Sequence, residues 1–257
     1  MIRLSSYFIS LLLIAIASTF CFSQPAGREV VTQSAEWFAL TSMIKVHKRV
    51  SIMAEGQFRY VKAFDPMQFQ IRTAVEVSLN KHWSVVPFGY VYTMNEKYGE
   101  QPAHFVNNEH RFWEQVTFKH AIGRFNISHR GRLEQRHIQV HTENDGQVIN
   151  HGFDQFLNRA RYRFMTNIPL NHATMEAKTV YASLYDEVFY SWGKDLTFDE
   201  PDQNRIFAGV GYQFTKLVAV QTGFFYQMLI KSNGTKQENN VGFQVQVNYN
   251  FDFTKKE

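Results

Sequence analysis

The chain has little of several things that decide a protein's class. It holds one cysteine and 6 prolines among 257 residues. Beyond the first two dozen residues, no apolar run approaches the roughly 18 residues that a membrane helix needs, because Gln221 and Gln227 interrupt the longest candidate, residues 218–230. The 27 basic and 23 acidic residues leave a dispersed net charge of +4, too weak to favour nucleic-acid binding. If this protein spans a membrane, it must do so with strands.

The first residues have the layout of a secretory signal peptide. Arg3 precedes an uncharged apolar run from Tyr7 to Phe22, and Cys21 and Ser23 occupy the small positions before a cleavage site. We predict cleavage after Ser23, which makes residues 1–23 the signal peptide and residues 24–257 one domain. No linker or low-complexity tract divides that domain.

The single cysteine allows a second interpretation, in which Cys21 is acylated and anchors a lipoprotein. The preceding Ser18-Thr19-Phe20 lacks the apolar-then-small pattern of such a site, which disfavours it. Cleavage after Ser23 leaves an exported chain with neither a disulfide nor a thiolate nucleophile. Such a composition suits a bacterial envelope protein.

Period-two alternation indicates strands through most of the chain, which also carries 24 Phe, 12 Tyr and 4 Trp. Residues 68–79 are the clearest case, with an apolar face from Phe69 to Leu79 and a polar face that includes Arg72 and Glu76. We expect the other strands at residues 36–46, 50–62, 83–94, 109–119, 125–137, 156–165, 175–190 with a bulge near Ser183, 205–214, 218–230 and 241–253.

The predicted connections alternate between short and long, as in outer-membrane barrels. We place short turns near 47–49, 80–82, 121–123, 166–172 and 215–217, and longer connections near 63–67, 95–108, 138–152, 191–203 and 231–240. The count is eleven strands, whereas bacterial single-chain barrels normally have an even number. We therefore predict about twelve, with a short first strand at residues 28–34, or ten as the alternative.

The last predicted strand, residues 241–253, has apolar or aromatic residues at every odd position and Gly, Gln, Asn or Asp at every even one. A soluble sandwich could bury the apolar face against a second sheet, but a membrane barrel exposes it to lipid. The predicted signal peptide, the alternation of short and long connections and the charged opposite faces of the strands favour exposure of the apolar face to lipid. The prediction is an all-β, transmembrane, antiparallel up-and-down barrel in the outer membrane of a Gram-negative bacterium, in contact with outer-membrane lipid. Its C-terminal strand would be the signal for the outer-membrane assembly machinery.

If the apolar faces point outward, many charged residues point to the interior of the barrel. Glu55 is an additional inward carboxylate that can pair with the arginines. The candidate charge network is Arg59, Arg72, Glu76, Glu109, Arg111, Arg130, Arg132, Glu134, Arg136, Arg159, Arg161, Arg163, Glu187 and Arg205. These ions could pair with one another, fill the barrel and hold the strands in register. Alternatively they form a selective channel or binding site for an anionic solute or lipid head group, which the excess of arginine favours.

Two further hypotheses concern chemistry. Ser128 beside His129 would suggest a lipid hydrolase, but adjacent strand residues point to opposite faces and cannot pair without a bulge. His137, His141, Glu143 and Asp145 could surround a metal ion, although their spacing matches no defined site. We predict no cofactor and no catalytic residue, with a lipid-modifying hydrolase as the alternative.

Several segments resemble an uncharacterised bacterial family catalogued as domain of unknown function 2490, whose members are predicted to form outer-membrane barrels. The segments are Glu109-His-Arg-Phe-Trp-Glu-Gln115, His129-Arg-Gly-Arg-Leu-Glu-Gln-Arg136, Arg159-Ala-Arg-Tyr-Arg163, Ile168-Pro-Leu-Asn171, Tyr185-Asp-Glu-Val-Phe189 and Asp202-Gln-Asn-Arg-Ile-Phe-Ala-Gly-Val-Gly-Tyr212. The resemblance implies an outer-membrane barrel and no particular activity.

Overall fold

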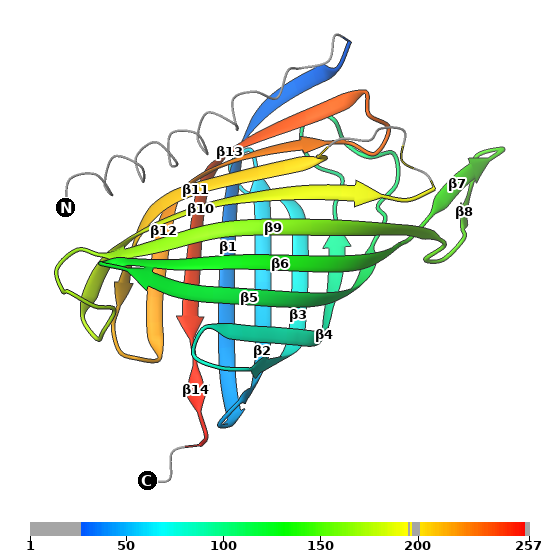
Figure 1. Cartoon of the computed structure of the whole chain (residues 1–257). Helices are drawn as coiled ribbons and strands as arrows, with labels where there is room; N and C mark the ends of the chain where they lie inside the picture. Colours follow the sequence, from blue (N-terminus) through cyan, green and yellow to red (C-terminus); the bar gives the residue numbers. More distant parts are fainter. Residues whose placement is uncertain (1–26, 195, 197–200, 255–257) are drawn as a thin grey trace.

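A computed structural model describes residues 27–194, 196 and 201–254 (Figure 1). The predicted signal peptide lies outside the described residues. The strands are β1 (Glu29–His47), β2 (Val50–Val61), β3 (Asp65–Ser78), β4 (Trp83–Asn95), β5 (Glu109–Ile122), β6 (Phe125–Ile138), β7 (His141–Asn144), β8 (Gln147–Asn150), β9 (Gln155–Pro169), β10 (Thr179–Trp192), β11 (Gln203–Gln213), β12 (Val218–Ile230), β13 (Lys236–Tyr249) and β14 (Phe251–Asp252). Among the described residues, no helix has the length and apolarity needed to cross a membrane.

The strands form a closed barrel, as predicted. Each long strand pairs antiparallel with the next long strand along the chain, and β6 pairs with β9 across the small β7–β8 hairpin. The barrel closes where β13 pairs with β1 from Glu29↔Lys236 to Thr41↔Asn248. This seam is parallel, unlike the other pairings between long strands, so the up-and-down pattern is interrupted once.

The twelve strands of the sheet include one that is only two residues long. The sheet contains twelve strands, in agreement with the prediction, but the twelfth is the dipeptide β14, which continues β13 past Asn250 and pairs with β1 (Figure 1). Residues 28–34 are not a separate strand, because β1 runs continuously from Glu29. Eleven long strands therefore form the wall. With an odd number, the first and last strands run in the same direction and can pair only in parallel.

Several local predictions were wrong. The predicted short turn near 166–172 is the nine-residue connection 170–178, because β9 runs to Pro169. β10 begins at Thr179 and keeps a continuous register with β9 and β11, so there is no bulge at Ser183. One of the register shifts lies instead between β4 and β5, around Pro87, whose nitrogen has no hydrogen to donate to a sheet. The predicted longer connection at 63–67 is a three-residue turn, since β3 already begins at Asp65.

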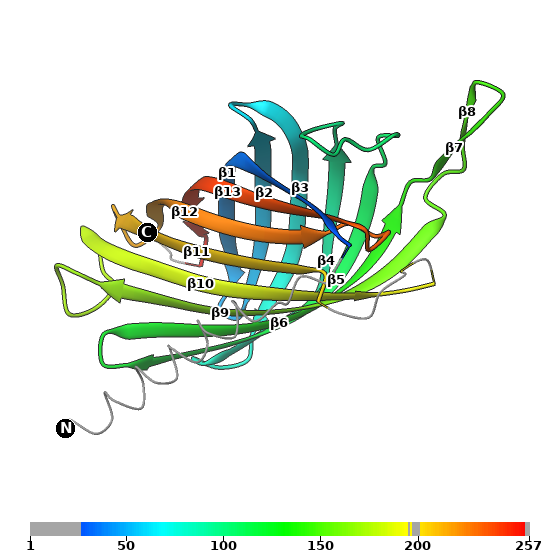
Figure 2. The ribbon, with the colours of Figure 1, turned by 90° about the horizontal axis from the view of Figure 1, so that it is seen from above.

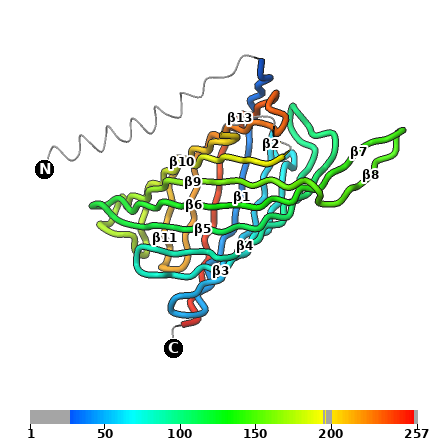
Figure 3. Tube along the Cα trace, turned by 45° about the vertical axis from the view of Figure 1, so that its right-hand side comes forward, coloured from blue at the N-terminus to red at the C-terminus, as the bar shows by residue number. Residues whose placement is uncertain are grey.

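The two rims of the barrel differ. One, the short-turn rim, carries the connections 48–49, 79–82, 123–124, 170–178 and 214–217. The opposite one, the long-loop rim, carries the connection 62–64 and four longer ones, including 96–108 and 139–154. The β7–β8 hairpin belongs to the second rim and stands away from the barrel (Figures 1, 2 and 3). Its turn uses Asp145 and Gly146, both with positive φ, as a two-residue hairpin turn requires.

The outward face of the wall is apolar and aromatic. Phe224 is 75% exposed, and Val210 and Leu133 are about half exposed. Rings also gather outside, as where Trp83 packs on Phe118 with centroids 4.7 Å apart. The inward face carries the buried residues, both apolar and polar. They include an aromatic cluster around Trp37, Tyr185, Phe207 and Phe225. The interior is therefore filled by side chains over much of its length.

The parallel seam depends on a glycine. A methyl group on Gly242 would overlap the main-chain carbonyl of Ala35 on β1, and two strands cannot move apart without losing their hydrogen bonds. Gly56 on β2 has no heavy atom within 4 Å of an added Cβ. It provides a matched control.

We expect Gly242→Val to prevent closure of the barrel, whereas Gly56→Val should leave it intact. The measurement is electrophoretic mobility of unheated, refolded protein in SDS, which separates closed barrels from open chains. Equal folded yields of the two variants would contradict the role of Gly242 at the seam.

Candidate functional site

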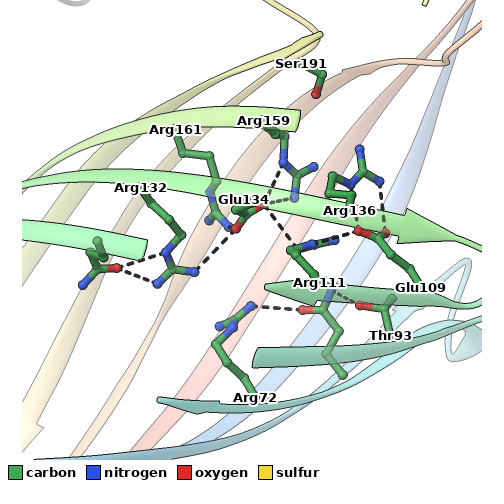
Figure 4. Close-up of polar contacts among 12 residues, drawn as sticks. Arg72, Thr93, Glu109, Arg111, Arg132, Glu134, Arg136, Arg159, Arg161 and Ser191 are labelled. Atoms are coloured by element: carbon green, nitrogen blue, oxygen red, sulfur yellow. Dashed lines mark hydrogen bonds and ion pairs between the residues drawn. The ribbon is translucent and has the colours of Figure 1, made fainter. Parts of the chain in front are cut away.

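Three adjacent strands bring most of the predicted charged residues together. The register places Arg111 opposite Arg136, Glu134 opposite Arg159, and Arg132 opposite Arg161. Because β5, β6 and β9 alternate in phase, these side chains all point to the inside of the barrel (Figure 4). The sequence pattern of alternate charged residues predicted this placement.

Glu134 is the centre of the cluster. Its side chain is 0% exposed, and its two carboxylate oxygens lie 2.6 Å from nitrogens of Arg159 and Arg161. Arg111 and Arg132 are within 3.6 and 3.7 Å. Four guanidinium groups from three strands thus share one carboxylate (Figure 4). Such an arrangement compensates the buried negative charge and leaves an excess of positive charge around it.

Two further carboxylates extend the network along the barrel. Glu109 accepts hydrogen bonds from Arg111 at 2.9 Å and from Arg136 at 2.7 Å. Glu187 on β10 pairs with Arg130, lies 2.7 Å from Arg161 and 4.0 Å from Arg205. Bidentate and shared pairs of this type favour arginine over lysine.

The remaining predicted residues are placed less centrally. Arg72 pairs with Glu55 on the neighbouring strand, and Arg59 is held by the amide oxygens of Gln57 and Gln68 at 2.6–2.9 Å. Glu76 sits at the register shift between β3 and β4, half-buried and outside the ion pairs found among the described residues. The structure does not bring it into the network.

Several interior guanidinium groups lie over aromatic rings. Arg132 is 3.8 Å from the ring centre of Trp113, Arg59 and Arg205 are 4.4 and 4.5 Å from that of Trp37, and Arg161 is 4.5 Å from that of Phe189. Cation–π contacts of this kind partly offset the loss of water around a buried cation. They accommodate positive charge where carboxylates are few.

The arginines line an interior cavity of about 150 Å³, whose lining also includes Asn95 and Tyr98 at the long-loop end of the barrel. Its charged lining consists of Arg59, Arg72, Glu109, Arg111, Arg136, Arg159, Arg161 and Arg205. One carboxylate therefore faces seven guanidinium groups among the described residues of this cavity. The space holds several water molecules or a small anion, since one water needs only about 10–15 Å³ on this scale.

The sequence predicted the connection near 95–108, but not that this loop contributes to the cavity. Tyr98 lines the cavity, and its hydroxyl donates to Glu238 on β13 at 3.0 Å. Burial and the Glu238 carboxylate hold the pKa of Tyr98 well above its usual value, so the phenol stays protonated and can donate. Lys231 pairs with the same carboxylate at 2.5 Å. No local pattern joins residues 140 positions apart.

The loop is also tied to the parallel seam. The main-chain nitrogen of Glu100 donates to the Gln33 side chain, and Gln101 donates to the carbonyl of Glu29. Gly99, directly before them, has φ of +73°, and a Cβ there would collide with Gln33, so only glycine suits this position. The loop thus bridges β4 and the start of β1.

The hydrolase and metal hypotheses gain no geometric support. His129 points outward and hydrogen bonds to the hydroxyl of Tyr162 at 2.8 Å, while Ser128 lies on the opposite face of β6. Of the metal candidates, His141 contacts Asn107 and Glu143 contacts His104. The described residues contain no group of three or more side chains arranged to hold a metal ion.

We expect Glu134→Gln to lower the free energy of unfolding by about 3–5 kcal/mol, because it leaves several buried guanidinium groups without their counter-charge. Urea unfolding of the detergent-solubilised protein, followed by tryptophan fluorescence, measures this change.

The matched control is Glu114→Gln. Glu114 lies on the outward face of β5, exposed, and accepts a hydrogen bond from Gln135. Its loss should cost at most about 0.5 kcal/mol. If the two variants are equally stable, the proposed central role of Glu134 is wrong.

Comparison with known proteins gives a family and nothing more specific. No curated protein and no solved structure matches the chain significantly. The sequence profile of one family, described as "Protein of unknown function (DUF2490)", matches residues 35–240. That range runs from β1 into β13 and includes the whole charge network. The resemblance seen in the arginine-bearing strands is therefore confirmed, and the chain belongs to the DUF2490 family.

Proposed function

We propose that this protein is an outer-membrane barrel, exported by its N-terminal signal peptide, that binds a small anionic ligand inside the barrel from the long-loop side. The observation that carries the ligand proposal is the charge of the interior cavity, where seven arginines face one carboxylate. The exposed apolar outer face supports the membrane proposal. Recognition of the C-terminal strand by the assembly machinery belongs to the same proposal.

The charge balance favours a ligand over a purely structural network. The predicted network has ten inward arginines, whereas the carboxylates that pair with them are Glu55, Glu109, Glu134 and Glu187. A network that served stability alone would be expected to balance its buried charges. The surplus attracts an anion into a water-poor space, where electrostatic attraction is stronger than in water.

Arg59 and Arg205 are the best candidates for direct contact with the ligand. Both line the cavity and lie over Trp37. Neither is saturated by carboxylates, since Arg59 is bound by amide oxygens and Arg205 has one carboxylate at 4.0 Å. Their hydrogen-bonding capacity is available to an incoming phosphate or carboxylate group.

A binding site fits the geometry better than an open channel. Glu134 and the guanidinium groups around it are almost completely buried, and the aromatic cluster fills space beside them. Ions would have to displace both groups of side chains to pass through the barrel. We therefore assign the interior to binding.

We expect the purified protein to bind inorganic phosphate in isothermal titration calorimetry, more weakly as the NaCl concentration rises. Combined Arg59→Gln and Arg205→Gln substitutions should weaken binding at least about ten-fold, because charge-assisted hydrogen bonds are lost.

The control for this experiment is Arg49→Gln, an exposed arginine at the short-turn rim, which should leave the affinity unchanged. The absence of heat with phosphate, citrate or sulfate would rule out the binding proposal. Steady ion conductance across planar bilayers would show instead that the barrel is an open channel.

Membrane orientation can be tested separately, because the predicted mature chain contains no cysteine. Gln147 in the β7–β8 hairpin and Lys81 in the turn at the short-turn rim are both exposed. We expect Gln147→Cys to react with a membrane-impermeant maleimide on intact cells, and Lys81→Cys to react only after the outer membrane is permeabilised. The reverse pattern would invert the orientation, and labelling of neither in permeabilised cells would contradict membrane insertion in this fold.

A further inference from the structure

A second cavity lies at the long-loop rim, next to the interior one. Its volume is about 260 Å³, and it shares Arg136, Arg159 and Leu229 with the interior cavity as lining residues. The rim cavity adds side chains of a different kind, among them Leu157, Ser191, Asp202 and Lys231. A ligand larger than a simple inorganic anion could therefore extend from one cavity into the other.

Asp202 lines the rim cavity and has one carboxylate oxygen without a hydrogen-bond partner. The residue is 6% exposed, and its Oδ2 accepts a hydrogen bond from the Ser191 hydroxyl at 2.8 Å. Its Oδ1 is buried and has no partner. A buried carboxylate oxygen without a donor is costly. This atom is suited to accept a hydrogen bond from a ligand.

Residues that line the interior cavity have the opposite need, because their unpaired atoms are hydrogen-bond donors. Gln203 and Arg205 are 4% and 8% exposed, and both line the interior cavity. The Gln203 Nε2 and the Arg205 Nε are buried donors without an acceptor. Within four residues of the chain, Asp202, which lines the rim cavity, thus has an unpaired acceptor, and Gln203 and Arg205, which line the interior cavity, have unpaired donors. Unpaired buried polar groups are few in native structures, and a bound ligand would supply the missing partners.

The charges at the rim restrict the kind of donor that Asp202 can receive. Arg136, Arg159 and Lys231 also line the rim cavity, so a ligand ammonium group would be repelled by three cations. A neutral hydroxyl group would not. The apolar walls contributed by Leu157 and Leu229 suit the C–H faces of a saturated ring.

We propose that the ligand is an acidic sugar, a uronate or a sugar phosphate, whose anionic group lies in the interior cavity near Arg205 and whose hydroxyl groups lie at the rim and donate to Asp202. The proposal rests on the anion-binding function and adds the ligand class. The acidic sugar can be free or the terminal residue of a surface glycan, since the rim cavity opens at the long-loop side.

Calorimetric titration of the full mature protein with matched ligands tests the ligand class. Glucuronate and cyclohexanecarboxylate carry the same charge on a six-membered ring, but only glucuronate has ring hydroxyl groups. We expect glucuronate to bind at least about ten-fold more tightly. Comparing free glucuronate with a glucuronate-terminated oligosaccharide then distinguishes the two sources.

The variant Asp202→Asn tests the residue. It should reduce the preference for glucuronate over cyclohexanecarboxylate to less than about three-fold, because a neutral amide is a weaker acceptor than a carboxylate, while inorganic phosphate still binds. The wild-type ligand series decides the ligand class even if this variant fails to fold.

The outcomes separate the two proposals. Phosphate binding with equal affinity for glucuronate and cyclohexanecarboxylate would overturn the acidic-sugar proposal and leave anion binding intact. An Asp202→Asn variant that keeps the full preference would overturn the role of Asp202. Failure of every anion, phosphate included, would overturn both proposals.

Discussion

The interaction on which the interior depends is the sharing of one fully buried carboxylate, Glu134, by arginines of three strands. Removing these charges from water is unfavourable unless they meet in good geometry. The strands can satisfy that condition in one register only, because a slip of one residue would turn every charged side chain to the apolar outer face. The pairing of Glu134 therefore fixes how β5, β6 and β9 align, and with them the position of every other charge in the cluster.

The same sharing creates the surplus of positive charge. Because four guanidinium groups use one carboxylate, the barrel needs fewer acids than arginines, and aromatic rings such as Trp37 and Trp113 take part of the remaining contact. Arg59 and Arg205, which no carboxylate of the described residues approaches closer than 4.0 Å, line a cavity. Stability and binding are thus two uses of one arrangement, in which the pairing of some arginines holds the others in place without neutralising them.

The alternation of residues allowed much of this to be predicted. A period of two placed Arg130, Arg132, Glu134 and Arg136 on one face and assigned that face to the interior, and the barrel follows from the same periodicity repeated. Periodicity carries no information on strand direction at the closure, so the parallel seam was not foreseen, although counting strands gave eleven. Tyr98 and Asp202, which contact Glu238 and Ser191 on strands, themselves lie in irregular segments. Their geometry is set by the closed barrel, not by nearby sequence.

The parallel seam also affects how the barrel can assemble. Each hairpin of the wall joins strands that are neighbours in sequence, but β1 and β13 are separated by almost the entire domain. Bringing such distant segments together has the largest chain-entropy cost of any pairing here, and parallel ladders are slightly weaker per residue than antiparallel ones. We therefore expect the seam to be the last ladder to form and the first to separate. In the loop 96–108, Glu100 and Gln101 hydrogen bond to the start of β1. These bonds stabilise the junction between β1 and β13 once it has formed.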